Sequence, residues 1–266
     1  MLAYLLYLIV GAVGGLLIGL VGGGIGPIVV PTLLFLLNKA GVEKSAAVHL
    51  AVGTSLAIVL VTTTISISGF QLGKLIQWPL LKRLLPGTLL GALAGSVGSA
   101  LLSGVFLQIM FGIFLIIVAI LTLKIKGELS QDNKIVELPS GAIIFICTVL
   151  LSAISTILGV SDGLLLVPFL RRYQLPMRDT IATATVCAFS ASVAGLIPYL
   201  LIGAHATNLP PNSFGFIYVP AFILIGIASC TTTPIGVYLN KILPEKKLKS
   251  IFSYFLMIIG LKMMFI

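Results

Sequence analysis

The chain has 266 residues, of which 59% are apolar and only 9% are charged, and its mean hydropathy is +1.21. Soluble domains carry about 25% charged residues, so this composition excludes a soluble globular protein and indicates an integral membrane protein. The net charge of +9 comes from short lysine and arginine clusters between apolar runs, which argues against a nucleic-acid-binding surface. Because runs such as 105–123 are apolar on every face, unlike barrel strands, we expect an all-α protein.

Apolar segments follow one another along the whole chain, five in each half. A helix needs roughly 20 apolar residues to cross a bilayer, and the second and seventh segments are shorter than this. Each short segment follows a glycine- or serine-containing break, which is typical of a broken or re-entrant helix. In chain order the expected segments are 2–20, 25–37, 46–68, 84–102, 105–123, 140–158, 163–170, 180–202, 216–239 and 248–265.

The two halves repeat one another. Residues 19–31 (GLVGGGIGPIVVP) align with residues 156–168 (TILGVSDGLLLVP), so that Pro31 pairs with Pro168. Further along, A-V-G-T at 51–54 corresponds to A-T-A-T at 182–185, and later blocks recur in the same order. The sequence therefore predicts two transmembrane repeats with a broken or re-entrant helix at the start of each, organised as a first repeat at 1–126, a cytoplasmic linker at 127–139 and a second repeat at 140–266.

The distribution of basic residues predicts how the repeats are oriented. Five segments per repeat is an odd number, so the second repeat starts on the opposite side of the membrane and the repeats are inverted. Alternating sides brings most of the basic residues to one face, which the positive-inside rule makes cytoplasmic; both termini are then outside. These residues are Lys74, Lys82, Arg83, Lys124, Lys126, Lys134, Arg171, Arg172, Arg178, Lys241, Lys246, Lys247 and Lys249.

The paired motifs carry a family resemblance. The doubled glycine block ending in V-P, the A-V-G-T-S stretch at 51–55 and the P-G-x-x-x-G-x-x-x-G helix at 86–95 resemble the TauE/SafE sulfite exporter family, also called the TSUP permeases. The similarity extends over essentially the whole chain. It implies a multipass carrier in a prokaryotic plasma (inner) membrane that moves sulfite, sulfonates or related organosulfur anions.

The two helix breaks are the predicted substrate site. A half-helix that starts inside the membrane presents free backbone N–H groups and a positive dipole end, which attract anions. Glycine lets a ligand approach the backbone closely; close helix packing is the alternative use of such small residues. We expect an oxyanion to bind at Gly22, Gly23, Gly24 and Gly26, with Ser161, Asp162 and Gly163 as their counterparts in the second repeat.

Asp162 is the only acidic residue embedded in an apolar segment, where an unpaired charge costs several kcal/mol. It could carry a proton during transport, or it could only cap the following helix. Burial favours the protonated acid and the helix N-terminus favours the carboxylate, so the sequence leaves its charge state open.

Hydroxyl and imidazole groups near the breaks are further candidates. Thr54, Ser55, Thr183 and Thr185 supply neutral donors for an anion, although such hydroxyls usually bond to their own helix backbone. His49 could assist proton coupling, or it could be an interfacial histidine.

These features predict a secondary carrier of small anions, coupled to protons. A proton- or cation-coupled carrier of another small solute, with Asp162 as ligand, is the alternative. No catalytic or metal-binding motif occurs in the sequence, so we expect no enzyme activity, no cofactor and no metal site. The expected partners are the substrate anion and the lipid bilayer, with a homo-oligomer possible and no nucleic acid.

The predicted orientation can be tested by cysteine labelling. In a chain whose native cysteines are replaced, a cysteine at position 74 should react with an impermeant reagent only from the cytoplasmic side. A cysteine at position 208 should react only from the opposite side. Labelling of both positions from the same side would contradict the inverted arrangement.

Overall fold

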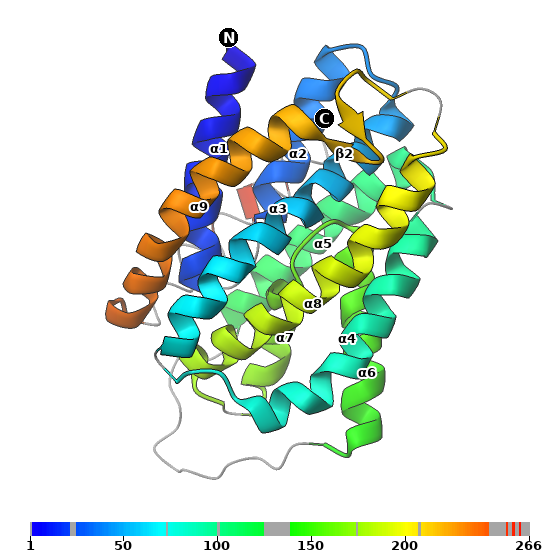
Figure 1. The fold of residues 1–266 in the computed structure, drawn as a ribbon. Coiled ribbons are helices and arrows are strands. Elements are labelled where there is room, and N and C mark those ends of the chain that lie inside the picture. Colours follow the sequence, from blue (N-terminus) through cyan, green and yellow to red (C-terminus); the bar gives the residue numbers. More distant parts are fainter. Residues whose placement is uncertain are drawn as a thin grey trace.

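The computed structural model describes residues 2–21, 25–72, 74–99, 102–124, 139–173, 175–206 and 209–244, together with residues 254, 257, 258 and 261. Within them the chain is almost wholly helical (Figure 1). The helices are α1 (Leu2–Val21), α2 (Gly26–Lys39), α3 (Lys44–Leu72), α4 (Trp78–Ser99), α5 (Gly104–Lys124), α6 (Gly141–Ile157), α7 (Gly163–Arg171), α8 (Met177–Gly203) and α9 (Val219–Ile242). The expected all-α membrane fold is confirmed.

Five of these helices are long and apolar enough to cross a membrane: α1, α3, α4, α8 and α9. Shorter apolar stretches lie in α2, α5 and α6. Side chains such as Leu201 and Ile227 are 63% and 59% exposed on the outside of the bundle, as expected where a protein faces lipid. Most of the tenth expected segment and nearly all of the 127–139 linker lie outside the described residues.

Both expected helix breaks are present. α1 ends at Val21 and α2 begins at Gly26, while α6 ends at Ile157 and α7 begins at Gly163. With 14 and 9 residues, α2 and α7 are too short to cross a bilayer. Each starts within the bundle and carries an internal proline, Pro31 or Pro168, at the position predicted from the repeat.

Some expected segment boundaries were wrong. α4 begins at Trp78 rather than at residue 84, and α9 runs from Val219 to Ile242 rather than from 216 to 239. In both helices a proline, Pro79 or Pro220, occupies the second residue, where its missing N–H costs nothing. Basic residues 82 and 83 therefore lie in the first turns of α4, although the sequence placed them in a loop.

A short antiparallel hairpin precedes α9 and was not expected from the sequence. Strands β1 (Ser213–Phe214) and β2 (Ile217–Tyr218) pair across Gly215, which has a φ of +56°. The hairpin packs on the end of α8: a Cβ atom at Gly203 would lie 2.3 Å from the nitrogen of Phe216. It marks the end of the bundle where α3 begins and α8 ends.

The most extensive helix contacts join the two halves reciprocally. α1 packs along α9, and α4 packs along α6. In both pairs, the first segment of one predicted repeat packs on the fourth segment of the other repeat. α9 also packs on α3, as α4 does on α8. Reciprocal packing of this kind is what two repeats related by a twofold axis produce, while their orientation across the membrane stays a prediction.

Small residues bring these helix pairs into backbone contact. Gly15 of α1 faces α9, where an added Cβ atom would lie 2.2 Å from the carbonyl oxygen of Ser229. Gly91 of α4 faces α6, where an added Cβ would lie 2.3 Å from the Val149 oxygen. Close approach through small residues spaced by four is a standard way to pack helices in a membrane.

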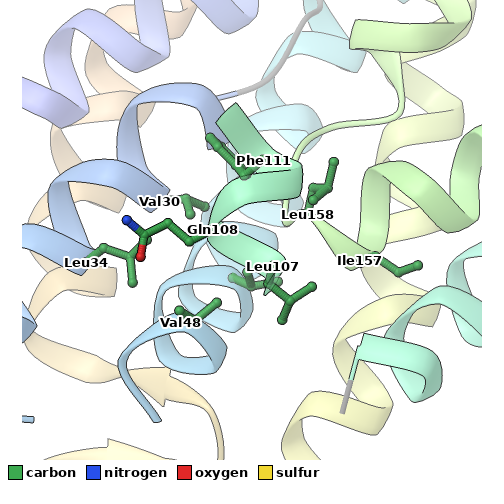
Figure 2. A pocket seen from close by; sticks show the side chains of 9 residues that line it. Val30, Leu34, Val48, Leu107, Gln108, Phe111, Ile157 and Leu158 are labelled. Carbon is green, nitrogen blue, oxygen red and sulfur yellow. The ribbon is translucent and has the colours of Figure 1, made fainter. Parts of the chain in front are cut away.

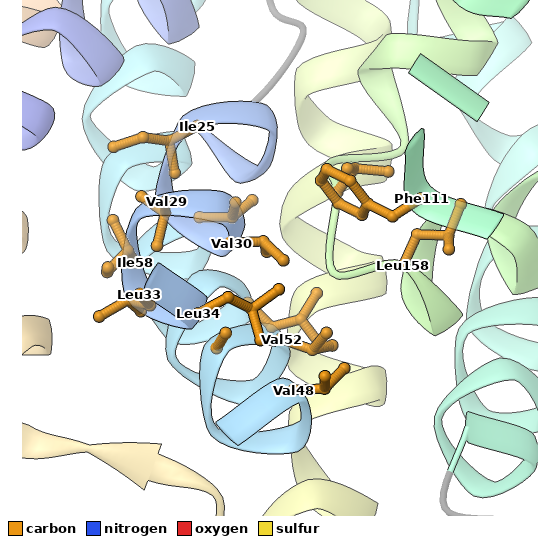
Figure 3. Close-up of a cluster of buried hydrophobic side chains, with 14 of the residues drawn as sticks. Ile25, Val29, Val30, Leu33, Leu34, Val48, Val52, Ile58, Phe111 and Leu158 are labelled. Atoms are coloured by element: carbon orange, nitrogen blue, oxygen red, sulfur yellow. The ribbon is translucent and has the colours of Figure 1, made fainter. Parts of the chain in front are cut away.

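Apolar side chains fill the space around the first break. Figure 3 shows Ile25, directly before α2, together with Val29 and Leu33 of α2 beside Ile58 of α3. Phe111 of α5 and Leu158 lie across from them. Because α2 is too short to span the membrane, this packing against neighbouring helices is what holds it in place.

The α4–α6 contact predicts a difference between two glycines of one helix. Gly91→Ala should lower the free energy of unfolding by about 1–3 kcal/mol, because the added methyl group overpacks the interface. Gly98→Ala should change it by less than about 1 kcal/mol, since no described atom from another helix lies within 4 Å of a Cβ there. Thermal unfolding of the purified variants in detergent measures both, and equal effects would contradict the packing.

Candidate functional site

The two helix breaks touch each other. A Cβ atom at Gly26 would lie 2.4 Å from the carbonyl oxygen of Gly159 and 2.8 Å from the Cα atom of Val160. Only glycine permits this distance between the start of α2 and the end of α6. Gly22, Gly23 and Gly24, which the sequence placed in the same site, lie outside the described residues.

Gly159 shapes the second break. Its φ of +66° is a left-handed conformation that glycine adopts readily, and it turns the chain away from the end of α6. The same residue packs on α3, because a Cβ atom there would lie 2.9 Å from the Cα atom of Val52. The break is therefore fixed by α2 on one side and by α3 on the other.

Ser161, Asp162 and Gly163 are all buried at the start of α7. The Gly163 N–H donates to the Ser161 hydroxyl oxygen at 3.3 Å. Asp162 occupies the N-cap position, but its backbone is helical and its side chain makes no capping hydrogen bond. The simple capping role considered for Asp162 is therefore not seen in this structure.

The carboxyl group of Asp162 is enclosed and has no hydrogen-bond partner within the described residues. Asp162 is 1% exposed, and neither side-chain oxygen accepts a hydrogen bond. Ser152 of α6 and the Cys187 thiol of α8 lie beside it, but the Ser152 hydroxyl donates to the Thr88 oxygen at 2.9 Å. A buried carboxyl group in this position can bind a proton, a cation or a hydrogen-bonding ligand.

The two repeats differ at this point. Ile25, the sequence counterpart of Asp162, is fully buried. Its side chain lies against Gly14 of α1, where a Cβ atom would come within 2.1 Å of the Ile25 Cγ1 atom. An apolar side chain therefore fills the position that Asp162 occupies in the second repeat.

Three of the four predicted hydroxyl groups connect different elements. Ser55 donates to the Gly159 oxygen at 2.8 Å, which ties α3 to the second break. Thr54 accepts from the Tyr218 N–H at 2.9 Å, and Thr183 accepts from the Gln77 N–H at 3.1 Å. Thr185 instead donates to Ile181 of its own helix at 2.8 Å, so the alternative of local bonding holds at this residue.

The Thr54 and Thr183 contacts correspond between the halves. In each, a threonine of one repeat's long third segment accepts a hydrogen bond from the residue directly before the fourth segment of the other repeat, at opposite ends of the bundle. The sequence alignment paired Thr54 with Thr185, so the structural counterpart is shifted by two residues to Thr183.

His49 lies with the hairpin and not with the second break. Its ring centre is 5.2 Å from that of Phe216, and the side chain is 7% exposed. The Nδ1 atom is buried without a hydrogen-bond partner in the described part of the chain. The structure thus separates the two residues that the sequence grouped as proton-coupling candidates.

A small cavity lies beside the breaks and is apolar (Figure 2). Its lining comes from α2, α3, α5 and the end of α6, and consists of Val30, Leu34, Val48, Val52, Leu107, Gln108, Phe111, Ile157 and Leu158. Of the predicted substrate-binding residues that the structure describes, none lines it. Sequence reasoning had also missed Ser152 as a neighbour of Asp162, although Ser152, Ser155 and Thr156 recur at helical spacing before the break.

Comparison with known proteins places the chain among transporters. The family model described as sulfite exporter TauE/SafE matches residues 7–263. A Haemophilus influenzae protein named "Probable membrane transporter protein" is 29% identical over 97% of both chains. A Methanocaldococcus jannaschii protein with the same description is 29% identical over 97% of this chain and 94% of its own. No solved structure matches.

The cross-repeat contact of Thr54 yields a matched pair of variants. Thr54→Val should destabilise the protein by about 1–3 kcal/mol, because it leaves the Tyr218 N–H without its acceptor. Thr62→Val in the same helix should cost much less, since the equally buried Thr62 hydroxyl donates to the oxygens of Ile58 and Val59 in its own helix. Thermal unfolding in detergent measures the pair; a larger effect of Thr62→Val would show that Thr54 does not hold the hairpin.

Proposed function

The chain belongs to the sulfite exporter TauE/SafE family, and from this premise we propose that it carries a small sulfur-containing anion, such as sulfite or a sulfonate, across the membrane together with a proton. Membership of the family and the names of its relatives make the protein a multipass membrane transporter, in agreement with the expectation that it is not an enzyme. The substrate, the coupling ion and the prokaryotic plasma membrane as its location are the parts that we propose.

One observation carries the proposal: the two helix breaks meet at Gly26 and Gly159, and Asp162 lies buried directly after this contact, with no described residue bonded to either of its oxygens. Helix starts that point into a membrane protein favour anions through their backbone N–H groups. A carboxyl group at the same place would repel an anion unless it carries a proton.

Charge compensation links the two ions. An ionised Asp162 and an anion about 4 Å apart would repel by roughly 4 kcal/mol at an effective dielectric constant near 20. A protonated Asp162 removes this repulsion and can donate a hydrogen bond to the anion. Loss of the proton on one side of the membrane then favours release of the anion on that side.

In this proposal some hydroxyl groups position the site and others bind the anion. Ser55 and Thr54 hold the break and the hairpin, so their hydrogen bonds position the site. Ser161 lies next to Asp162 and accepts only a long hydrogen bond of 3.3 Å, which leaves its hydroxyl proton free to bind an anion. Gly22, Gly23 and Gly24 remain proposed anion-binding residues on the sequence alone.

A second candidate is a proton- or cation-coupled carrier of a different small solute. The observation that favours it is the unpaired carboxyl group itself, because two free carboxylate oxygens also suit a cation such as Na⁺. Anion fluxes into liposomes containing the purified protein discriminate the two. Accumulation of sulfite or a sulfonate driven by a pH gradient supports the anion carrier, and accumulation that requires a Na⁺ gradient supports the alternative.

Asp162→Asn is the decisive variant in the same assay. It should bind and exchange the anion at nearly normal rates, because the amide still donates a hydrogen bond, but accumulation driven by a pH gradient should be abolished. Asp179→Asn is the control. The Asp179 side chain lies away from the break and accepts a hydrogen bond of 2.9 Å from the Gln77 side chain, and an amide oxygen can accept the same bond. Normal accumulation by Asp162→Asn would exclude Asp162 as the proton carrier.

A further inference from the structure

Buried polar groups continue from Asp162 along the interface of α4, α6 and α8. These three helices pack on one another (Figure 1), and all run toward the end of the bundle that carries the hairpin. Their order along this interface follows from helix geometry, because residues four apart lie one turn above each other on the same face. The polar groups are therefore stacked from the middle of the bundle toward one end.

Contacts between helices locate three points of the stack, and helical spacing relates them to one another. Ser152 lies beside Asp162, and Thr156 is one helical turn further along α6. The Thr156 Cγ2 atom lies 2.7 Å from the Cβ position at Gly195 of α8, so the two helices meet there. Tyr199 is one turn beyond Gly195, and its side chain lies beside Ser99 of α4.

The polar atoms along this stack lack partners in the described part of the protein. Besides the two Asp162 oxygens, they are the Ser155 hydroxyl, the Thr156 hydroxyl and the Tyr199 hydroxyl. Tyr199 is 2% exposed and Thr156 is 1% exposed. The Ser99 hydroxyl donates to the Ser96 oxygen at 2.8 Å, and therefore its proton is not available to Tyr199. Buried hydroxyl groups of this kind are normally hydrogen-bonded to ordered water.

We propose that a chain of buried water molecules connects Asp162 to Tyr199 and conducts the transported proton. This inference rests on the proposed role of Asp162 as proton carrier and adds the route by which the proton reaches it. A water molecule hands a proton to the carboxylate and receives one from its neighbour. At Tyr199 the hydroxyl oxygen accepts a proton from one side and gives its own to the other, so no residue gains or loses charge except Asp162.

The corresponding interface of the other half lacks a buried carboxyl group among the described residues. There the position of Asp162 is filled by Ile25, and the matching α1–α9 interface has its hydroxyl groups satisfied. Ser229 bonds to the Ile225 oxygen and Thr233 bonds to the Ser229 oxygen, both in their own helix. Among the described residues of α1, α3 and α9, the Ser66 hydroxyl and the Asn240 Oδ1 atom are also buried without partners, but Ile25 stands there in place of a carboxyl group.

Aromatic rings close the route at the hairpin end. The Phe216 ring lies 6.3 Å from the Tyr199 ring and 5.2 Å from the His49 ring, so it stands between them. His49 is the titratable group beyond this closure, and the Cys187 thiol is the titratable group that faces Asp162 at the other end. A movement of the hairpin that shifts Phe216 would connect Tyr199 to His49 and to the aqueous phase.

Water access is tested without any transport. Thr156→Cys and Thr233→Cys are each placed in a chain whose native cysteines are replaced, and the rate of thiol modification by Ag⁺, an ion small enough to follow water, is measured in detergent. We expect the Thr156→Cys thiol to react at least about tenfold faster than the Thr233→Cys thiol. This ratio corresponds to a difference of ~1.4 kcal/mol in the free energy of exposing the thiol to water. Equal rates would overturn the water chain, whether or not the protein is a proton-coupled carrier.

The role of Tyr199 is tested in liposomes. Tyr199→Phe keeps the ring against Phe216 and removes only the hydroxyl group, so anion exchange should be unchanged. Accumulation driven by a pH gradient should slow about tenfold, the effect of losing one hydrogen-bonded link. Tyr7→Phe in α1, another buried tyrosine, is the control and should slow neither process.

The outcomes separate this inference from the proposed function. If the wild-type protein shows no pH-driven accumulation, the proposed function fails, and the Ag⁺ rates still decide whether water reaches Thr156. If the wild type is proton-coupled and Tyr199→Phe accumulates the anion at the normal rate, the route through Tyr199 is wrong. If Tyr199→Phe does not fold, Thr156→Val replaces it in the assay, with Thr233→Val as its control.

Discussion

Contact between the two helix breaks through bare backbone is the constraint on which the rest of the described structure depends. With a Cβ position at Gly26 only 2.4 Å from the Gly159 oxygen, the start of α2 and the end of α6 approach as closely as two chains can. In hydrocarbon, an interrupted helix is tolerable only where protein or water satisfies its free backbone groups. Ser55 of α3 does so for Gly159, and the apolar cluster around α2 excludes lipid from the first break.

The same solution recurs at the periphery of the bundle. On α1 and α4, an added methyl group would come close to a backbone oxygen of α9 or α6 at Gly11, Gly15, Gly19, Gly87, Gly91 and Gly95. Because lipid chains are as apolar as leucine, burial of apolar surface does little to drive such helices together. Close packing and hydrogen bonds such as that from Asn240 to the Leu20 oxygen hold the helices in place instead.

The two repeats pack almost symmetrically, but they differ in the chemistry of one corresponding position. Ile25 and Asp162 occupy corresponding positions, yet one fills its space with an apolar side chain and the other brings a carboxyl group into a buried, unpaired position. Two halves that pack alike, with one buried carboxyl group among the described residues, suit the proposed carrier, in which one repeat supplies mainly shape and the other also supplies the proton-binding group.

The sequence by itself determined the membrane class, the two short segments and the correspondence of Pro31 with Pro168, because hydropathy, glycine position and repeat spacing are local or periodic properties of the chain. It also singled out Asp162, since an acid in an apolar run is costly wherever the fold places it. Segment limits at Trp78 and Val219 were missed because prolines in a first turn are compatible with both a loop and a helix.

Tertiary structure alone decided which groups meet. The sequence listed Thr54, Ser55, Thr183 and Thr185 as equals, and only packing between the repeats made three of them cross-links and left Thr185 bonded to its own helix. It likewise separated His49 from Asp162 and brought Ser152 and Cys187 beside the carboxyl group. Such contacts join residues far apart in the chain, and no local pattern records them because they arise from how the two halves dock.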